Sequence, residues 1–230
     1  PSVSISATIS RAWVMTFASF GLYLLQVIVS REQEMAKAMS GQNTVTPTAE
    51  GLAASVSAVK TRGLPPVEKW NPPFCGDLDM EIRRDGTWFY QGTPIGRKRL
   101  VKLFASILIR EDDKYFLVTP VEKVGIKVED APFVAIDFEA SGEGRDQVLT
   151  FQTNLEDIAV AGPDLPIRFV RDADTDQPSP YVRIRRNLEA LIDRKSFYRL
   201  IKLGVHHDGW FGVWSGGEFF GFIPSSELPD

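Results

Sequence analysis

Residues that identify the common enzyme and metal-binding classes are scarce in this sequence. Among its 230 residues there is one cysteine, Cys75, and there are two histidines, His206 and His207. A single cysteine cannot form an internal disulfide or supply a cysteine-rich zinc cage. The Gly-x-Ser-x-Gly elbow, the Walker loop and the Gly-x-Gly-x-x-Gly fingerprint are missing as well. We therefore expect no cofactor and no metal site, and a cytoplasmic location is the default.

A large excess of charge of one sign is also lacking. The formal net charge is −4, while 43% of the residues are hydrophobic and 24% are charged. This composition is typical of a globular protein, which excludes disorder throughout the chain. Binding to phosphate backbones or anionic lipid requires a positive field over the contact surface, so nucleic acid is an unexpected partner.

The first part of the chain reads differently from the rest. Residues 12–29 carry no charged side chain, and their length is near the lower limit for a helix that spans a bilayer. Two interpretations of residues 1–38 stay open. In the first, they are a membrane anchor. In the second, residues 1–34 are translated upstream sequence and the mature protein starts near Met35, which precedes an ordinary polar N-terminus. A membrane is a partner only if residues 12–29 are expressed.

Residues 39–63 are rich in small and polar side chains, which predicts a flexible tail or linker. Alternatively, residues 49–60 within this segment form one short amphipathic helix. Leu52, Val56 and Val59 would then lie on one face.

Regular patterns begin after residue 64. Residues 78–84 and 88–91 read as two strands joined by a turn at Asp85-Gly86. Thr93 is then expected to cap a helix whose first residue is Pro94 and whose apolar face extends through Leu108. Residues 114–119 and 124–128 have the apolar character of strands.

Similar sequence returns near the C-terminus. Residues 181–186 match 80–84, and residues 192–195 match 95–98, with Asp193 expected to cap the second helix. An aromatic hairpin with a Ser-Gly-Gly turn follows. Its two strands, and the other strands predicted between the copies, are residues 210–214, 218–223, 132–139, 147–153, 158–161 and 166–170. The sequence thus predicts an α+β fold with a duplicated strand–helix–strand motif, in domains of residues 64–130 and 131–230.

Several unusual blocks occur in a characteristic order. They are Trp70-Asn71-Pro72, Gly76-Asp77-Leu78-Asp79-Met80, Asp85-Gly86-Thr87-Trp88, Pro94-Ile95, Leu117-Val118-Thr119-Pro120-Val121-Glu122-Lys123 and Ile192-Asp193-Arg194. With these blocks, residues 64–228 resemble the bacterial family called domain of unknown function 1285. The resemblance implies a two-domain α+β fold whose C-terminal domain is loosely like pleckstrin-homology folds. It implies no established reaction and no catalytic residues, and it suggests a role in signalling or macromolecular assembly.

Charge is segregated along the chain. Basic side chains cluster at residues 83–102 and again at 183–202, whereas residues 129–176 are acidic. Such charge predicts solvated faces with salt bridges between the regions, or alternatively an anion site where Arg-Lys pairs lie near helix N-termini. Adding two aromatic side chains, the candidate ligand-binding residues are Arg97, Lys98, Arg185, Arg194, Lys195, Trp88 and Trp210.

Most of the remaining reactive side chains are predicted to have structural roles. Cys75 follows an apolar stretch and is predicted to be a buried thiol. His206-His207-Asp208 is expected to cap the aromatic hairpin, and the acidic run 172–176 to be a surface loop, because it lacks the glycine and the final acid of a calcium loop. Asp77 and Asp79 serve either acid–base chemistry or the adjacent turn.

These observations favour a binding or interaction protein, with its contact surface in a groove between the two domains. An apolar groove edged with arginine suits a protein partner or a small anionic ligand, and a homo-oligomer is left open. The alternatives are an enzyme of unrecognised type, and nucleic-acid binding through the basic clusters.

Overall fold

The computed structural model describes residues 47–57, 63–171 and 177–228. The apolar segment 1–38, Val59 and the acidic run 172–176 lie outside these residues. Among the described residues, no helix combines the length and the apolar character needed to cross a membrane.

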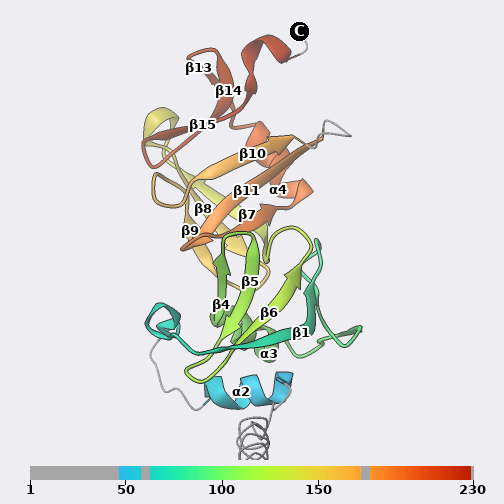
Figure 1. The fold of residues 1–230 in the computed structure, drawn as a ribbon. Coiled ribbons are helices and arrows are strands. Elements are labelled where there is room, and N and C mark those ends of the chain that lie inside the picture. The colour runs from blue at the N-terminus through green and yellow to red at the C-terminus, as the bar shows by residue number, and fades with distance from the viewer. Residues whose placement is uncertain (1–46, 58–62, 172–176, 229–230) are drawn as a thin grey trace, which may run out of the picture. The chain divides into compact units, whose positions relative to one another are not determined.

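The first sheet, in the N-terminal half of the described chain, has six strands in the order β3-β2-β1-β6-β5-β4. Figure 1 shows β1, β6, β5 and β4 side by side. Strand β1 pairs in parallel with β6, and the other neighbours are antiparallel. The predicted hairpin around Asp85-Gly86 is confirmed. The bounds are β1 Phe74–Ile82, β2 Trp88–Tyr90, β3 Thr93–Pro94, β4 Leu108–Glu111, β5 Lys114–Val118 and β6 Lys123–Val128.

Helix α3 (Lys98–Ser106) packs on this sheet through Phe104, whose ring stacks on Trp88 of β2 with 6.4 Å between centroids. The predicted helix start at Thr93 is wrong, because Thr93 and Pro94 pair with β2 as an edge strand. An edge strand tolerates a proline, since no partner needs its missing N–H. The predicted end is wrong too, because Leu108 already belongs to β4.

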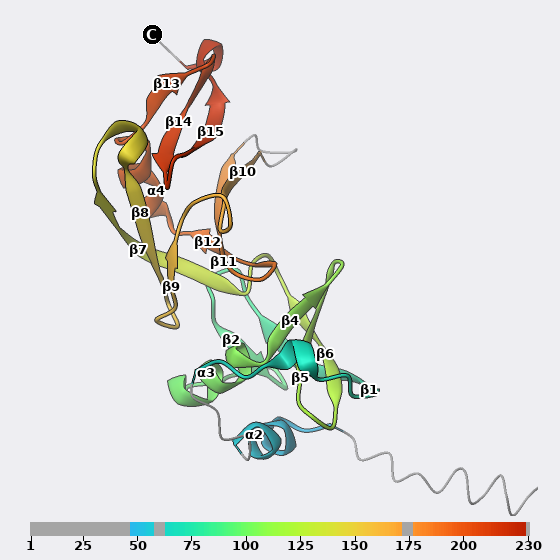
Figure 2. The ribbon, with the colours of Figure 1, turned by 90° about the vertical axis from the view of Figure 1, so that its left-hand side faces the viewer.

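Helix α2 (Ala49–Ser57) lies beside α3, as Figures 1 and 2 show. Its Leu52 is fully buried and its Val56 is 3% exposed, so both join the core of the sheet region. The short amphipathic helix is therefore present over residues 49–57, within the segment for which a linker was also considered.

The second sheet, in the C-terminal half, has the order β10-β11-β12-β7-β8-β9, with a parallel contact between β12 and β7. A separate three-stranded sheet, β13-β14-β15, contains the predicted aromatic hairpin. The bounds are β7 Phe133–Ser141, β8 Val148–Thr153, β9 Ile158–Val160, β10 Ile167–Arg171, β11 Pro178–Arg185, β12 Leu188–Ile192, β13 Val205–His207, β14 Trp210–Ser215 and β15 Glu218–Pro224. Helix α4 (Arg194–Ile201) and the short helices η1 (Val67–Lys69), η2 (Gly144–Asp146) and η3 (Ser225–Glu227) complete the described elements.

Candidate ligand groove

Helix α4 starts where the sequence predicted it. The Asp193 carboxylate accepts a hydrogen bond from the Ser196 backbone N–H at 2.7 Å, which confirms Asp193 as the N-cap. The Asp193 N–H donates to the Ala135 carbonyl of β7 at 2.9 Å, so the start of the helix is tied to the second sheet. Arg194, the first residue of the helix, is consequently held at a defined place.

One side of α4 meets the aromatic hairpin across an apolar cavity of about 270 Å³. Its wall contains half-buried phenylalanines from four elements: Phe169 of β10, Phe197 of α4, Phe211 of β14 and Phe222 of β15. The Phe169 and Phe222 centroids are 4.1 Å apart, and those of Phe211 and Phe222 are 5.8 Å apart. Figure 2 shows α4 and the hairpin strands gathered at this end of the second sheet.

A second cavity of about 610 Å³ adjoins the first and shares Pro178, Phe197 and Ile201 with it. Its lining is more polar and includes Arg84, Arg194 and the phenol ring of Tyr198. We call these two adjoining cavities the α4 groove. The groove therefore has an apolar end at the hairpin and a polar end at the N-terminus of α4.

Three arginines line the α4 groove, and they differ in their partners. Arg84 donates to the Ser179 hydroxyl at 2.9 Å and lies 3.4 Å from the Asp130 carboxylate. Arg171 pairs with the Glu227 carboxylate. For Arg194, the described part of the chain places no carboxylate within ion-pair distance. Its guanidinium carbon lies 6.0 Å from the Tyr198 ring centroid, so this cation remains available to a ligand.

A polar network fixes the wall beside Arg84. Burial, with help from the hydrogen bond to Asp130, raises the pKa of Tyr181 to about 12. The Tyr181 hydroxyl therefore stays protonated and donates to the Asp130 carboxylate at 2.7 Å. Because Asp130 accepts this bond and also attracts Arg84, it joins β11 to the loop that follows β6.

Of the candidate residues predicted from the sequence, the α4 groove contains Arg194 alone. Lys195 is exposed beside it on α4, and Trp210 is 46% exposed on β14. Arg97 is the exposed N-cap of α3 and lies outside the groove. Trp88 is 1% exposed and belongs to the core.

The other two candidates form ion pairs within the protein. The Lys98 ammonium lies 2.7 Å from the Glu156 carboxylate, which Lys102 also contacts. Arg185 contacts the Asp157 carboxylate and donates to the Ala105 carbonyl at 2.7 Å. These pairs join α3 to the turn before β9, so salt bridges between basic and acidic regions, one of the two predicted uses of the charge, are present.

Several groove residues were not singled out from the sequence. Phe169 and Pro178 come from the β10–β11 pair, and Tyr198 follows Phe197 on α4. The sequence did contain a signal for Tyr198. Arg194, Tyr198 and Ile201 are four and three positions apart, so they lie on one face of α4. That β10 lies opposite this face depends on the tertiary structure, so local sequence patterns do not predict it.

The prediction that Cys75 is a buried thiol is wrong, because its thiol is free and exposed. Strand β1 pairs irregularly with β6 between Phe74 and Asp77, and Gly76 has a φ of 100°. Further along β1, Leu78 and Met80 are buried while Asp77 and Asp79 are exposed, and Cys75 has the spacing of the exposed residues.

The histidines take part in the hairpin. The His206 Nδ1 lies 2.8 Å from the Ser225 hydroxyl, and the His207 ring packs 4.8 Å from Trp214 between centroids. Among the described residues, no group of three or more histidine, cysteine or acidic side chains is placed to hold a metal ion.

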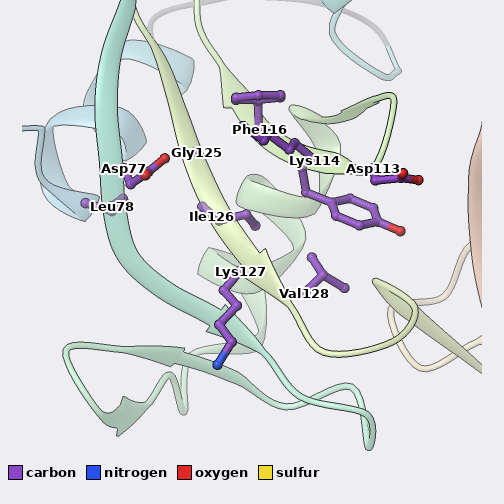
Figure 3. A pocket seen from close by; sticks show the side chains of 10 residues that line it. Asp77, Leu78, Asp113, Lys114, Phe116, Gly125, Ile126, Lys127 and Val128 are labelled. Carbon is purple, nitrogen blue, oxygen red and sulfur yellow. The ribbon is translucent and has the colours of Figure 1, made fainter.

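The outer face of the first sheet has another hollow, of about 400 Å³ (Figure 3). The Asp77 carboxylate lies over the bare backbone of Gly125, where a methyl group would overlap it. Lys127 in this hollow pairs with Glu81 at 3.4 Å, and Asp113 pairs with Arg110 at 3.1 Å. Because two of its charges already have partners, this hollow is a weaker candidate than the α4 groove.

Comparison with known families matches residues 65–131 to the domain of unknown function (DUF1285), N-terminal domain, and residues 132–222 to the protein of unknown function (DUF1285), C-terminal domain. A crystal structure of a DUF1285 family protein from Silicibacter pomeroyi DSS-3 has 62% sequence identity and a TM-score of 0.73, covering 77% of this chain and 97% of that one. Another, from Shewanella baltica OS155, has 32% identity and a TM-score of 0.44, covering 55% of this chain and 92% of that one. No curated protein matches the chain. The two family matches meet between β6 and β7.

Proposed function

The chain belongs to the DUF1285 family, as its resemblance indicated, and from that premise we propose that it is a binding protein whose contact surface is the α4 groove. Its ligand joins an apolar part to an anionic group. The observation that carries this proposal is Arg194, a cation without a carboxylate partner among the described residues, at the edge of an apolar cavity.

The apolar end of the groove supports the first half of the proposal. An empty cavity of about 150 Å³ lined by apolar side chains is large enough to bind benzene. The cavity of about 270 Å³ beside Phe222 therefore has room for a larger apolar group. Ligand sites commonly combine such an apolar wall with a few polar groups that orient the ligand.

The polar end supports the second half. A guanidinium is always charged and its planar set of donors matches a carboxylate or phosphate. Arg84 belongs to the region matched by the N-terminal family domain, whereas Arg194 belongs to the C-terminal one. We therefore propose the α4 groove as the groove between domains that the sequence predicts, with Arg84 as the contribution of the N-terminal region.

The arrangement of acidic and histidine side chains supports binding over catalysis. Asp77 and Asp79 lie on β1 of the first sheet, whereas His206 lies on β13 of the third sheet. An acid–base site needs such groups around one pocket. Nucleic-acid binding is also disfavoured, because Lys98 and Arg185 of the two basic clusters are engaged by Glu156 and Asp157.

The proposal also includes the more detailed predictions that the sequence makes about the fold, the role and the location of the protein. In support of duplication, β1-β2-α3-β4-β5-β6 and β11-β12-α4-β13-β14-β15 have the same order of strands and helix, except that the short β3 stands between β2 and α3 in the first unit. The copies differ in pairing, since β6 joins β1 whereas β13-β14-β15 form their own sheet. We also propose a pleckstrin-homology-like C-terminal domain, a domain boundary near Asp130, a role in signal transduction and a cytoplasmic location.

The proposal is tested by titrating the chain with anilinonaphthalene sulfonate, a fluorescent probe with an apolar ring system and one anionic group. We expect saturable binding that weakens about five-fold in Arg194→Ala, as for loss of one exposed charge contact. Ile201→Asp should also weaken it, because a carboxylate would enter the wall shared by both cavities.

The matched control is Arg145→Ala, which removes another arginine that lies against an aromatic ring, in this case Trp214 at 5.3 Å. Arg145 is outside the α4 groove, so probe affinity should stay unchanged. Equal loss in both arginine variants, or no saturable binding to the parent chain, contradicts the proposal.

A further inference from the structure

This inference rests on the proposed function and names the class of partner. We propose that the α4 groove takes a segment of a protein partner in which an acidic residue and a bulky apolar residue stand about three positions apart in an extended chain. The acidic side chain meets Arg194, and the apolar side chain enters the cavity beside Phe222.

The spacing follows from the face of α4 that lines the groove. Arg194, Phe197, Tyr198 and Ile201 all contribute to the lining, and they stand at positions i, i+3, i+4 and i+7. A helix rises 1.5 Å per residue, so this face is about 10 Å long from Arg194 to Ile201. An extended peptide advances about 3.3 Å per residue and covers the same length in about three residues.

A continuous row of rings joins the two ends of the groove. The Tyr198 and Phe197 centroids are 6.4 Å apart, and those of Phe197 and Phe222 are 6.5 Å apart. Arg194 stands next to Tyr198 at the start of this row. A peptide lying along α4 therefore meets aromatic surface between its acidic and its apolar anchor, and such rings are frequent hot spots of protein interfaces.

The exposure of the groove favours a peptide over a small molecule. Tyr198 is 55% exposed, and Arg194 is exposed as well. Small-molecule sites usually bury about 70–90% of the ligand. A ligand on this open face would keep much of its surface in water, whereas a protein segment is covered on its other side by the rest of its own protein.

Charge complementarity selects an acidic segment. Arginines supply three of the charged groups that line the groove, and the one carboxylate, Asp193, is already engaged as the cap of α4. Arg84 and Arg171 have the internal partners Asp130 and Glu227. Arg194 is thus the cation left for a carboxylate of the partner, in a protein whose net charge is −4.

The test is a selection of random dodecapeptides on phage against the full chain. We expect enriched peptides to carry Asp or Glu about three residues away from a Phe, Trp, Leu or Ile. One enriched peptide is then synthesised with a fluorescent label, and its affinity is measured by anisotropy. Arg194→Glu should weaken it more than about ten-fold, because it exchanges attraction for like-charge repulsion.

The control variant is Lys195→Glu, which makes the same change of charge one residue away, outside the groove lining. Its affinity should fall by less than about two-fold, as expected for a screened surface charge. Because both side chains are exposed, we expect both variants to melt at the temperature of the parent chain, and this is checked before the affinities are compared.

The outcomes separate the inference from the proposed function. If the fluorescent probe binds at the groove but no peptide is enriched, the peptide inference fails and the binding function stands. If enriched peptides lack the acidic residue, or bind Arg194→Glu and the parent chain equally, the inference fails as well. If neither probe nor peptides bind, the proposed function itself is wrong.

Discussion

At the scale of single residues, charge in this protein serves mainly to join its parts. Arg185 is the clearest case, because its guanidinium is mostly buried, with 12% of the side chain exposed, and lies 4.8 Å from the Phe133 ring. Burial lowers the pKa of Arg185, while the Asp157 carboxylate opposes that effect. The sequence predicts Arg185 as a ligand-binding candidate, and the structure places its guanidinium in contact with Asp157 and the Ala105 carbonyl.

We expect Arg185→Met to lower the free energy of unfolding by about 3 kcal/mol, because it leaves the Asp157 carboxylate half-buried without its partner. The measurement is the midpoint of urea unfolding. Arg199→Met is the matched control, since its ion pair with Asp137 is 43% and 53% exposed. That variant should cost less than about 1 kcal/mol. Equal losses would contradict a special role for Arg185.

Glu156 allows a pH prediction at the same scale. Hydrogen bonds from Lys102 and Lys98 lower the pKa of Glu156 to about 2, from its ordinary value of 4.5. A lowered pKa stabilises the fold above pH 4.5, and this contribution is lost as the pH falls toward 2. In an NMR titration, the Glu156 carboxyl should change near pH 2 in the parent chain. Combined Lys98→Met and Lys102→Met should return it toward 4.5, and an unchanged midpoint would contradict the assignment.

At the scale of elements, the two principal helices of the domains differ at their N-termini. Asp193 caps α4 with its side chain, whereas Arg97 at the start of α3 makes no such hydrogen bond. The sequence signals were Asp193 for one helix and Thr93-Pro94 for the other. The second signal failed because Thr93 and Pro94 pair with β2, and the Ile95 N–H donates to the Trp88 carbonyl at 2.8 Å.

We expect Asp193→Ala to reduce stability by about 1 kcal/mol through loss of the N-cap. Asp193→Ser keeps an oxygen that accepts from the Ser196 N–H, so it should retain most of the stability. Thermal unfolding of the two variants provides the comparison. If both lose stability equally, the cap does not account for the effect.

At the scale of the whole molecule, the residues that the structure describes, from 47 to 228, belong to one compact unit that includes α2. Leu52 of α2 is fully buried, and the cluster of buried side chains to which it belongs extends through both family regions. The helix is therefore part of the folded protein although it precedes the residues matched by the family domains.

We expect Leu52→Ala to lower the free energy of unfolding by about 3 kcal/mol, the usual cost of removing a buried leucine side chain. Glu50→Ala on the exposed face of the same helix should change it by less than about 0.5 kcal/mol. Urea unfolding of the two variants tests this. A neutral Leu52→Ala would show that α2 contributes nothing to the stability of the unit.

Local patterns in the sequence by themselves determined most of the elements and the family. The Asp85-Gly86 and Ser215-Gly216-Gly217 turns, the alternating strands and the Asp193 cap act over a few residues, so their physics is contained in the sequence. The same holds for the helical face on which Arg194 and Ile201 stand.

Only the tertiary structure decided which of these residues lie together. It buried Trp88 against Phe104, paired Arg185 with Asp157, and brought Phe169 and Arg84 to the groove beside Arg194. These outcomes depend on strand order and on contacts between residues far apart in the chain. A turn or a cap is specified by neighbouring residues. That no described carboxylate pairs with Arg194 depends instead on where the fold places these carboxylates.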